Sequence, residues 1–143
     1  AEGSKIFVHA SACRSNLSYL PALEAMASRR SWPFSIHPLR PKDAGGMNVP
    51  YQDIAPDYGE LRSALTGRVT SLTGFPSCVA RGIQGLDSCR DAEIADSMRL
   101  YLHHQAFVKP AECASCPERD TCAGTFEEHL RSRPGELAEL TFL

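Results

Sequence analysis

The hydrophobic and polar positions of the chain predict three strands in succession. Short apolar runs that are rich in β-branched residues, or that alternate apolar with polar, are typical of strands. Such runs cover residues 5–10, 34–39 and 68–73. The first two are each followed by a polar segment and then by helical spacing, so the chain predicts repeated strand–helix units.

Helical periodicity fills the intervals between and after these strands. We expect one helix from Ser18, which can serve as its N-cap, to Arg30. Asp57 and Glu60 have the spacing of a capping box and predict a second helix. Further helices are expected at 91–102 and 125–133, although residues 100–108 also alternate in the manner of a strand. The last helix is polar, so His129 within it is expected to be solvated.

Successive strand–helix units favour parallel strands with right-handed crossovers. We therefore expect an α/β fold, either a small open sheet or part of a parallel (βα) barrel. In such folds ligand groups gather at the carboxyl ends of strands. The segments that follow the three strands carry Asn16, Arg40 and Cys78, and residues 42–56 form an expected Gly- and Pro-rich loop at the same edge.

Composition restricts the functional classes. The 143 residues are 43% hydrophobic and 22% charged, with a net charge of −2, as in an ordinary soluble domain. That charge gives no electrostatic reason to expect nucleic acid or an anionic membrane as a partner. No apolar run approaches the roughly 20 residues of a membrane-spanning helix. The first residues show no signal-peptide pattern. The sequence also lacks an initiator Met and leads almost directly into the first expected strand, so we expect a processed chain or a fragment of a larger fold.

The cysteines carry the clearest chemical signal. Cys113, Cys116 and Cys122 have the spacing C-x2-C-x5-C, which suits one metal ion or one iron–sulfur cluster better than disulfides. A fourth ligand is expected from Cys78, which a Gly-Phe-Pro turn delivers past the third strand, or from Cys89. Thiolates accept both zinc and iron–sulfur clusters, and the spacing leaves the choice open. Reduced thiols predict a cytoplasmic location.

This segment resembles the C-terminal auxiliary-cluster extension of radical S-adenosylmethionine enzymes, the SPASM and twitch extensions. The resemblance lies in Phe107-Val-Lys109-Pro-Ala-Glu-Cys113-x2-Cys116-x5-Cys122-x-Gly124, followed by Gly135-Glu136 and Glu139. Gly74-Phe-Pro-Ser-Cys78 resembles the turn that presents a further cluster cysteine in several such families. Residues 1–73 resemble the last strands of the partial barrel that precedes the extension, which is expected to cover residues 74–143.

The resemblance also implies contacts with S-adenosylmethionine in the barrel part. Arg14-Ser-Asn16-Leu17 and His37-Pro-Leu-Arg40-Pro are similar to strand ends near that cofactor, which makes Asn16 and Arg40 the expected contacts. The chain departs from the family in lacking the radical-initiating C-x3-C-x2-C loop, and Phe126 stands where the full SPASM pattern has another cysteine. It therefore supports one auxiliary [4Fe–4S] cluster, and no radical chemistry of its own.

Two functions follow from these expectations. In the first, the chain is the C-terminal part or the partner subunit of a radical S-adenosylmethionine maturase acting on a peptide or small metabolite. An N-terminal half-barrel or partner protein would then carry the radical-initiating cluster, and the auxiliary cluster would assist substrate positioning or electron transfer. In the second, the chain is a stand-alone zinc or iron–sulfur module for interaction or electron transfer, without catalysis of its own.

Overall fold

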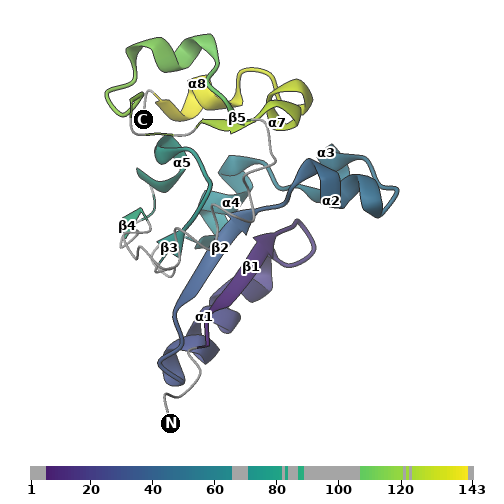
Figure 1. The fold of residues 1–143 in the computed structure, drawn as a ribbon, viewed down its shortest axis with the longest axis vertical. Coiled ribbons are helices and arrows are strands. Elements are labelled where there is room, and N and C mark those ends of the chain that lie inside the picture. The colour runs from purple at the N-terminus through teal and green to yellow at the C-terminus, as the bar shows by residue number, and fades with distance from the viewer. Residues whose placement is uncertain are drawn as a thin grey trace.

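The computed structural model describes residues 6–65, 71–81, 83, 87–88, 107–120, 122 and 124–141 of the chain. Within these ranges a parallel sheet lies at the centre, helices pack behind it, and the cysteine-rich segment lies beyond the carboxyl ends of β1 and β2 (Figure 1). Among the described residues, no helix has the length and apolar character needed to span a membrane.

The four strands of the sheet are parallel and follow the order β1-β2-β3-β4. They are β1 (Val8–Ala12), β2 (Phe34–Pro38), β3 (Ser71–Leu72) and β4 (Asp87–Ser88). β1 and β2 pair along their whole length, from Val8 opposite Phe34 to Ala12 opposite Pro38. Each predicted strand overlaps an observed one, whereas β4 was not predicted. The partial barrel stays a prediction, because open parallel sheets occur in several α/β folds.

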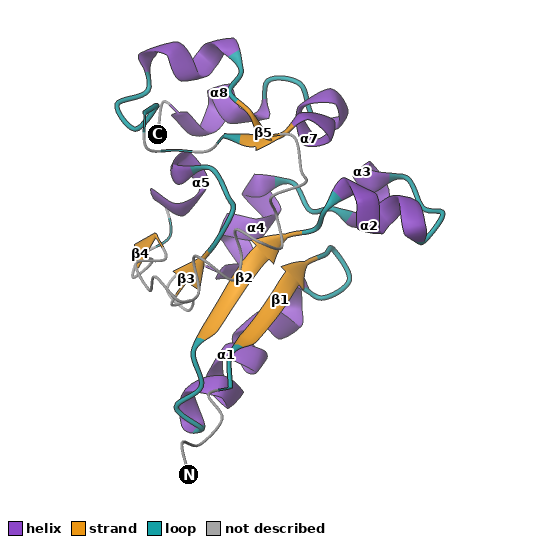
Figure 2. Ribbon diagram, in the orientation of Figure 1, coloured by secondary structure: helices purple, strands orange, loops and turns teal. Residues whose placement is uncertain are grey.

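Helices connect the strands (Figure 2). They are η1 (Leu17–Tyr19), α1 (Leu20–Arg29), α2 (Pro41–Gly46), α3 (Tyr51–Ile54), α4 (Tyr58–Leu65) and α5 (Ser77–Arg81). The predicted capping box is confirmed before α4: the Glu60 amide donates to Asp57 Oδ1 at 2.6 Å, and the Asp57 amide donates to Glu60 Oε2 at 3.0 Å. Ser18 was wrong as an N-cap, because it lies inside η1 and α1 begins without a side-chain cap.

The predicted loop at 42–56 was also wrong, since α2 and α3 occupy most of it. Prolines and a glycine in and beside this range mark helix ends, and Pro50 is the N-cap of α3. Pro41 is the first residue of α2 and Gly46 the last, which is the arrangement that the missing proline N–H and the flexibility of glycine favour. A small second core forms here from Leu39, Ala44, Tyr51 and Ala55, with Cys13 and Ile54 packed against it.

The main core lies between the sheet and the helices α1, α4 and α5. Ile36, Leu61 and Leu65 are fully buried in it. Leu137 and Leu140 join the same core from α8 (Glu136–Thr141). The predicted division at residue 73 therefore falls inside one continuous core, and the two-part organisation stays a prediction.

The C-terminal part contains a short antiparallel pair and helices. These elements are β5 (Phe107–Val108), η2 (Ala111–Ser115), β6 (Thr125–Phe126) and α7 (Glu127–Ser132), followed by α8. The helix predicted at 125–133 is shorter, because Thr125 and Phe126 pair with β5. After it, Gly135 has a φ of 85° and lets the chain turn into α8, which was not predicted.

Candidate metal centre

The C-x2-C-x5-C segment is closed at its base by the β5–β6 pair. Phe107 lies opposite Phe126, with ring centroids 4.8 Å apart, and Val108 lies opposite Thr125. The pairing brings together the two ends of a segment that contains all three cysteines, so the thiols are confined to one compact loop. Gly124 has a φ of +91°, and a Cβ at this position would collide with the Val108 carbonyl group.

Inside the segment the backbone folds into consecutive turns. The Cys116 amide donates to the Cys113 carbonyl at 3.1 Å, which makes C-x2-C a tight turn at the end of η2. The Cys122 amide donates to the Glu118 carbonyl at 2.9 Å. All three cysteines are partly buried. Turns of this kind are how a short cysteine motif directs several sulfurs to one side.

Cys78 reaches this segment from α5. The Gly-Phe-Pro turn was predicted to place Cys78 directly past a strand end, whereas the structure places it inside α5, where it is 7% exposed. The amide of its neighbour Ser77 donates to Cys122 Sγ at 3.4 Å, and the Gly124 amide donates to the same sulfur at 3.4 Å. Both hydrogen bonds fix the position of the Cys122 sulfur relative to the start of α5 and the turn at Gly124.

The four thiols influence one another electrostatically. The pKa of Cys78 rises from its ordinary 9.0 to about 11, first because of burial and then because of Cys122, Cys113 and Cys116. The pKa of Cys113 is also raised, by burial first and then by Cys122, Cys116 and Glu112, while Lys109 lowers it. Thiolates repel one another strongly enough to raise a pKa only when the sulfurs lie close together. The hydrogen bond from the Ser77 amide to Cys122 Sγ shows the same proximity, because Cys78 is the next residue on α5.

The donor set fits a thiophilic metal centre. Four thiols and no competing hard ligand in the set suit zinc or an iron–sulfur cluster, and a positively charged centre would relieve the repulsion among the thiolates. In the part of the chain that the structure describes, no three His, Cys, Asp or Glu side chains are grouped closely enough to form a ready coordination sphere. Binding would thus require the thiols to move closer together.

The other predicted residues lie at the strand ends. The side-chain amide of Asn16 donates through Nδ2 to the Ser11 carbonyl at 2.8 Å, and its Oδ1 accepts from the Cys13 backbone amide at 2.9 Å. Asn16 therefore shapes the turn after β1. Arg40 is half-buried just after β2. Their contact with S-adenosylmethionine stays a prediction. Burial raises the pKa of Cys13, which is the opposite of an activated thiol. Cys89 lies outside the described residues.

The expectation of a solvated His129 was wrong, because the structure buries this side chain among polar and aromatic partners. His129 is 2% exposed, and its Nε2 lies 2.6 Å from Glu136 Oε2. Its ring stacks on Tyr58 at 4.1 Å between centroids, and the Tyr51 hydroxyl lies 3.4 Å from Nδ1. The remaining Glu136 oxygen accepts from the Tyr58 amide. The Gly135-Glu136 pair was noted in the sequence, but nothing in a polar helix indicates which face packs inward.

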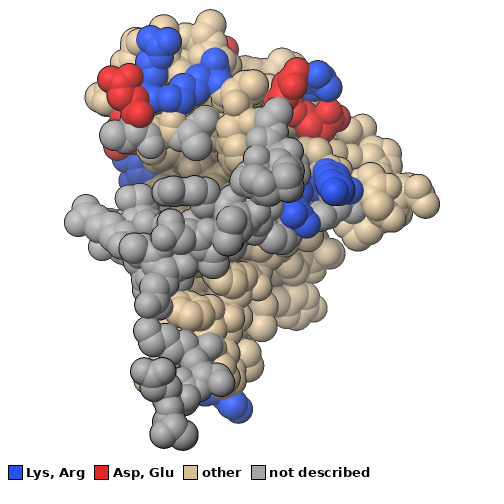
Figure 3. Space-filling view, viewed as in Figure 1, with Lys and Arg blue, Asp and Glu red and all other residues tan. Residues whose placement is uncertain are grey.

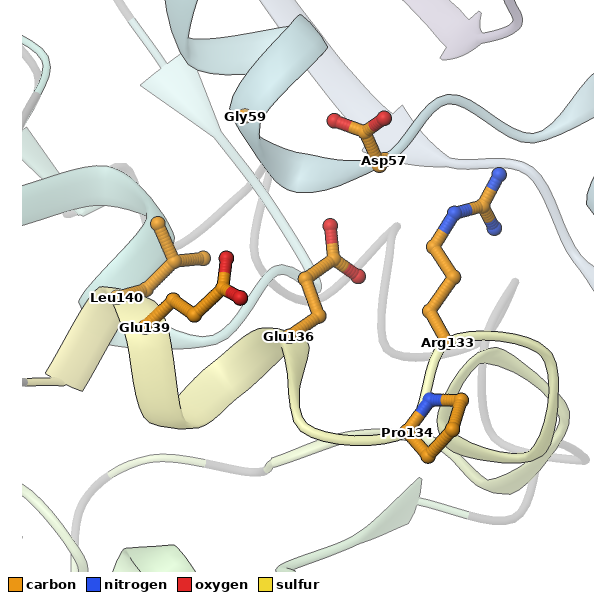
Figure 4. A pocket seen from close by; sticks show the side chains of 7 residues that line it. All are labelled: Asp57, Gly59, Arg133, Pro134, Glu136, Glu139 and Leu140. Atoms are coloured by element: carbon orange, nitrogen blue, oxygen red, sulfur yellow. The ribbon is translucent and has the colours of Figure 1, made fainter.

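A pocket of about 420 Å³ adjoins this buried pair. Its lining residues come from α4, α8 and the segments before them: Asp57, Gly59, Arg133, Pro134, Glu136, Glu139 and Leu140. Figure 4 shows the carboxylates of Asp57, Glu136 and Glu139 grouped around one space, with Arg133 at its side. Arg133 is held by the Gln52 and Ala55 carbonyls at 3.2 and 2.7 Å. The pocket thus marks the junction between α3–α4 and α7–α8.

No family model, curated protein or solved structure that was compared with the chain matches it. The site must therefore be interpreted from its own geometry and chemistry.

Proposed function

We propose that Cys78, Cys113, Cys116 and Cys122 hold one auxiliary [4Fe–4S] cluster. In this proposal the chain is the C-terminal part, or the partner subunit, of a radical S-adenosylmethionine maturase. The observation that carries the proposal is the hydrogen bond from the Ser77 amide to Cys122 Sγ at 3.4 Å, which places the start of α5, with Cys78 as its second residue, beside the C-x2-C-x5-C segment. Cys78 is far from the other three cysteines in the sequence, so its position near Cys122 comes from the tertiary fold.

The residues of this chain have distinct parts in the proposal. Cys113 and Cys116 provide two thiolates from one turn, and Cys122 provides a third whose sulfur the Ser77 and Gly124 amides position. Cys78 provides the fourth from a rigid helix. A bound cluster of this type can carry an electron or hold a substrate group. S-adenosylmethionine binding at Asn16 and Arg40 would require a half-barrel or partner that supplies the radical-initiating cluster.

A second candidate is a stand-alone metal-binding module without catalysis, with zinc in place of the cluster. Four thiolates, two of them in a C-x2-C turn, also match the ligand set of a structural zinc site. In that case the centre would brace the C-terminal part for interaction with another protein. The two candidates differ in the metal that the purified protein contains, which elemental analysis measures directly.

The test compares two cysteine variants after anaerobic reconstitution. Cys116→Ser should lose its metal and loosen the segment 107–141, because ligation is coupled to folding at such sites. Cys13→Ser is the matched control, since Cys13 packs in the second core and should leave metal content unchanged. Full metal loading in Cys116→Ser, or equal loss in both variants, would contradict the proposed ligand set.

A further inference from the structure

The strand β1 lies at one edge of the parallel sheet, and its outer side carries free backbone groups (Figure 2). The Val8 amide donates to the Pro33 carbonyl at 2.8 Å, so the backbone groups of Val8 point toward β2. Along a strand, the N–H and C=O groups of successive residues point to opposite sides. The backbone groups of His9 and Ser11 therefore point away from β2.

Asn16 closes this edge at its carboxyl end. Its Nδ2 donates to the Ser11 carbonyl, and its Oδ1 accepts from the Cys13 backbone amide, as the backbone of a neighbouring strand would do. Among the described residues, no hydrogen bond occupies the His9 amide, the His9 carbonyl or the Ser11 amide. A short row of backbone donors and acceptors is thus available for pairing with another strand.

The side chains along this edge do not protect it from pairing. Edge strands of monomeric proteins usually carry a charged residue or a proline, which prevents another strand from adding to the sheet. Residues 6–12 contain neither. The first of them, Ile6, is 48% exposed directly before β1. These features are typical of an edge that another strand covers.

We propose that β1 pairs in antiparallel orientation with β1 of a second copy of this chain, around a two-fold axis at His9. In this register the His9 amide of each copy donates to the His9 carbonyl of the other, and each Ser11 amide donates to the Phe7 carbonyl of the other. The Ser11 carbonyl stays bonded to Asn16. The free groups of His9 and Ser11 are all matched by the same surface of the second copy, as an isologous dimer requires.

The side chains fit the same arrangement. Antiparallel pairing brings the amino end of one β1, where Ile6 lies, to the carboxyl end of the other, which η1 follows with Tyr19 as its last residue. Ile6 and Tyr19 are 48% and 65% exposed. A surface that repeats these two residues in reverse order matches them, which favours a second copy over an unrelated strand. Burial lowers the pKa of His9, so the two facing imidazoles are neutral at neutral pH and do not repel each other.

The experiment measures the molar mass of the full chain by sedimentation equilibrium from micromolar to millimolar concentration, with a reductant present to prevent disulfide-linked dimers. Wild type is compared with His9→Pro and His9→Ala. Both variants lose the hydrogen bond of 2.7 Å between His9 Nδ1 and Ser35 Oγ, but only His9→Pro also loses the outward amide. We expect wild type to dimerise. The dissociation constant should be about tenfold or more higher in His9→Pro than in His9→Ala, because two backbone hydrogen bonds are lost.

Hydrogen exchange of the His9 and Ser11 amides in wild type is the second measurement, and their protection should rise with protein concentration. Wild type that stays monomeric throughout would overturn the proposal. Equal dissociation constants in His9→Pro and His9→Ala would place the interface elsewhere and would also overturn it. Protection that does not change with concentration would show that the edge is already covered or stays open, which contradicts the pairing. If His9→Pro does not fold, the exchange measurement on wild type decides the case.

Discussion

At the scale of single residues, the backbone of Gly124 is tightly constrained. Its φ of +91° lies in the left-handed region, and the Val108 backbone occupies the space that a side chain would need. The same residue donates its amide to Cys122 Sγ. A substitution here would therefore disturb both the β5–β6 pairing and one proposed ligand.

We predict that Gly124→Ala costs about 3 kcal/mol or more of unfolding free energy, from left-handed strain plus collision with Val108. Gly135→Ala is the control. Gly135 has a similar φ of +85° but nothing within 4 Å of an added Cβ, so it should cost only about 1 kcal/mol. Denaturant titration of both variants measures the difference. Equal losses would contradict the close approach of Val108.

Cys78 gives a prediction for pH. Its pKa in the folded metal-free protein is about 11, compared with 9.0 for an ordinary thiol. A group with a raised folded pKa favours the folded state at lower pH and loses that contribution as pH rises. The metal-free, reduced protein should therefore lose stability between about pH 9 and pH 11. Thermal unfolding in chelator at several pH values measures this, and Cys78→Ala should show a shallower fall. If the stability of Cys78→Ala fell just as steeply with pH, the raised pKa of Cys78 would be contradicted.

The residue scale shows where sequence reasoning succeeds and where it stops. The capping box of Asp57 and Glu60 was predictable, because its donors and acceptors are local. The burial of His129 was not, because its partners Tyr51 and Tyr58 lie more than 70 residues earlier in the chain. Hydrophobic spacing carries no information about a polar side chain that is buried by such distant partners.

At the scale of elements, α8 supports the cysteine centre from behind. It packs against α5, which carries Cys78, and against η2, which carries Cys113. Its first residue, Glu136, binds both His129 of α7 and the first residue of α4, Tyr58. The Tyr58 hydroxyl also pairs with Thr125 of β6. These contacts fasten the cysteine segment to the carboxyl-end side of the sheet.

We predict that His129→Ala costs about 3 kcal/mol or more of unfolding free energy, because it removes a buried ring and leaves Glu136 Oε2 without its hydrogen-bond partner. Arg131→Ala on the same helix is the control. Its pairs with Glu127 and Glu128 are exposed and should contribute less than about 1 kcal/mol. Chemical denaturation of both variants tests the contrast. A loss in His129→Ala no greater than in Arg131→Ala would show that the buried pair does not hold the helices together.

The boundaries of helices and strands could be predicted where the sequence carried a single clear pattern. β2 was expected from its alternation of apolar and polar residues, although the structure buries it at every position. The region of α2 and α3 was misassigned because Pro and Gly are frequent both in loops and at the ends of short helices. Burial of Tyr51 and Ala44 in the second core favours helix there, and that packing cannot be inferred from local composition.

At the scale of the whole molecule, the parallel sheet presents its strand ends toward the cysteine-rich part. In the view of Figure 3, acidic and basic side chains lie next to each other at the end of the molecule that carries the C-terminus. Arg131–Glu127 and Arg81–Glu118 are two of the ion pairs in the C-terminal part and beside it. The motif and its expected ligands were found from sequence. Cys78 follows β3 as predicted, but its place inside the short helix α5, near Cys122, depends on tertiary packing that local turn signals do not show.

The most direct test of the account is the metal content and absorbance of anaerobically purified, reconstituted protein. One [4Fe–4S] cluster per chain predicts equal iron and acid-labile sulfide and a broad band at about 400 nm, from thiolate-to-iron charge transfer. Cys78→Ser should lower this content, whereas Cys13→Ser should not. Colourless protein with stoichiometric zinc would contradict the cluster, and full iron loading without Cys78 would contradict the fourth ligand.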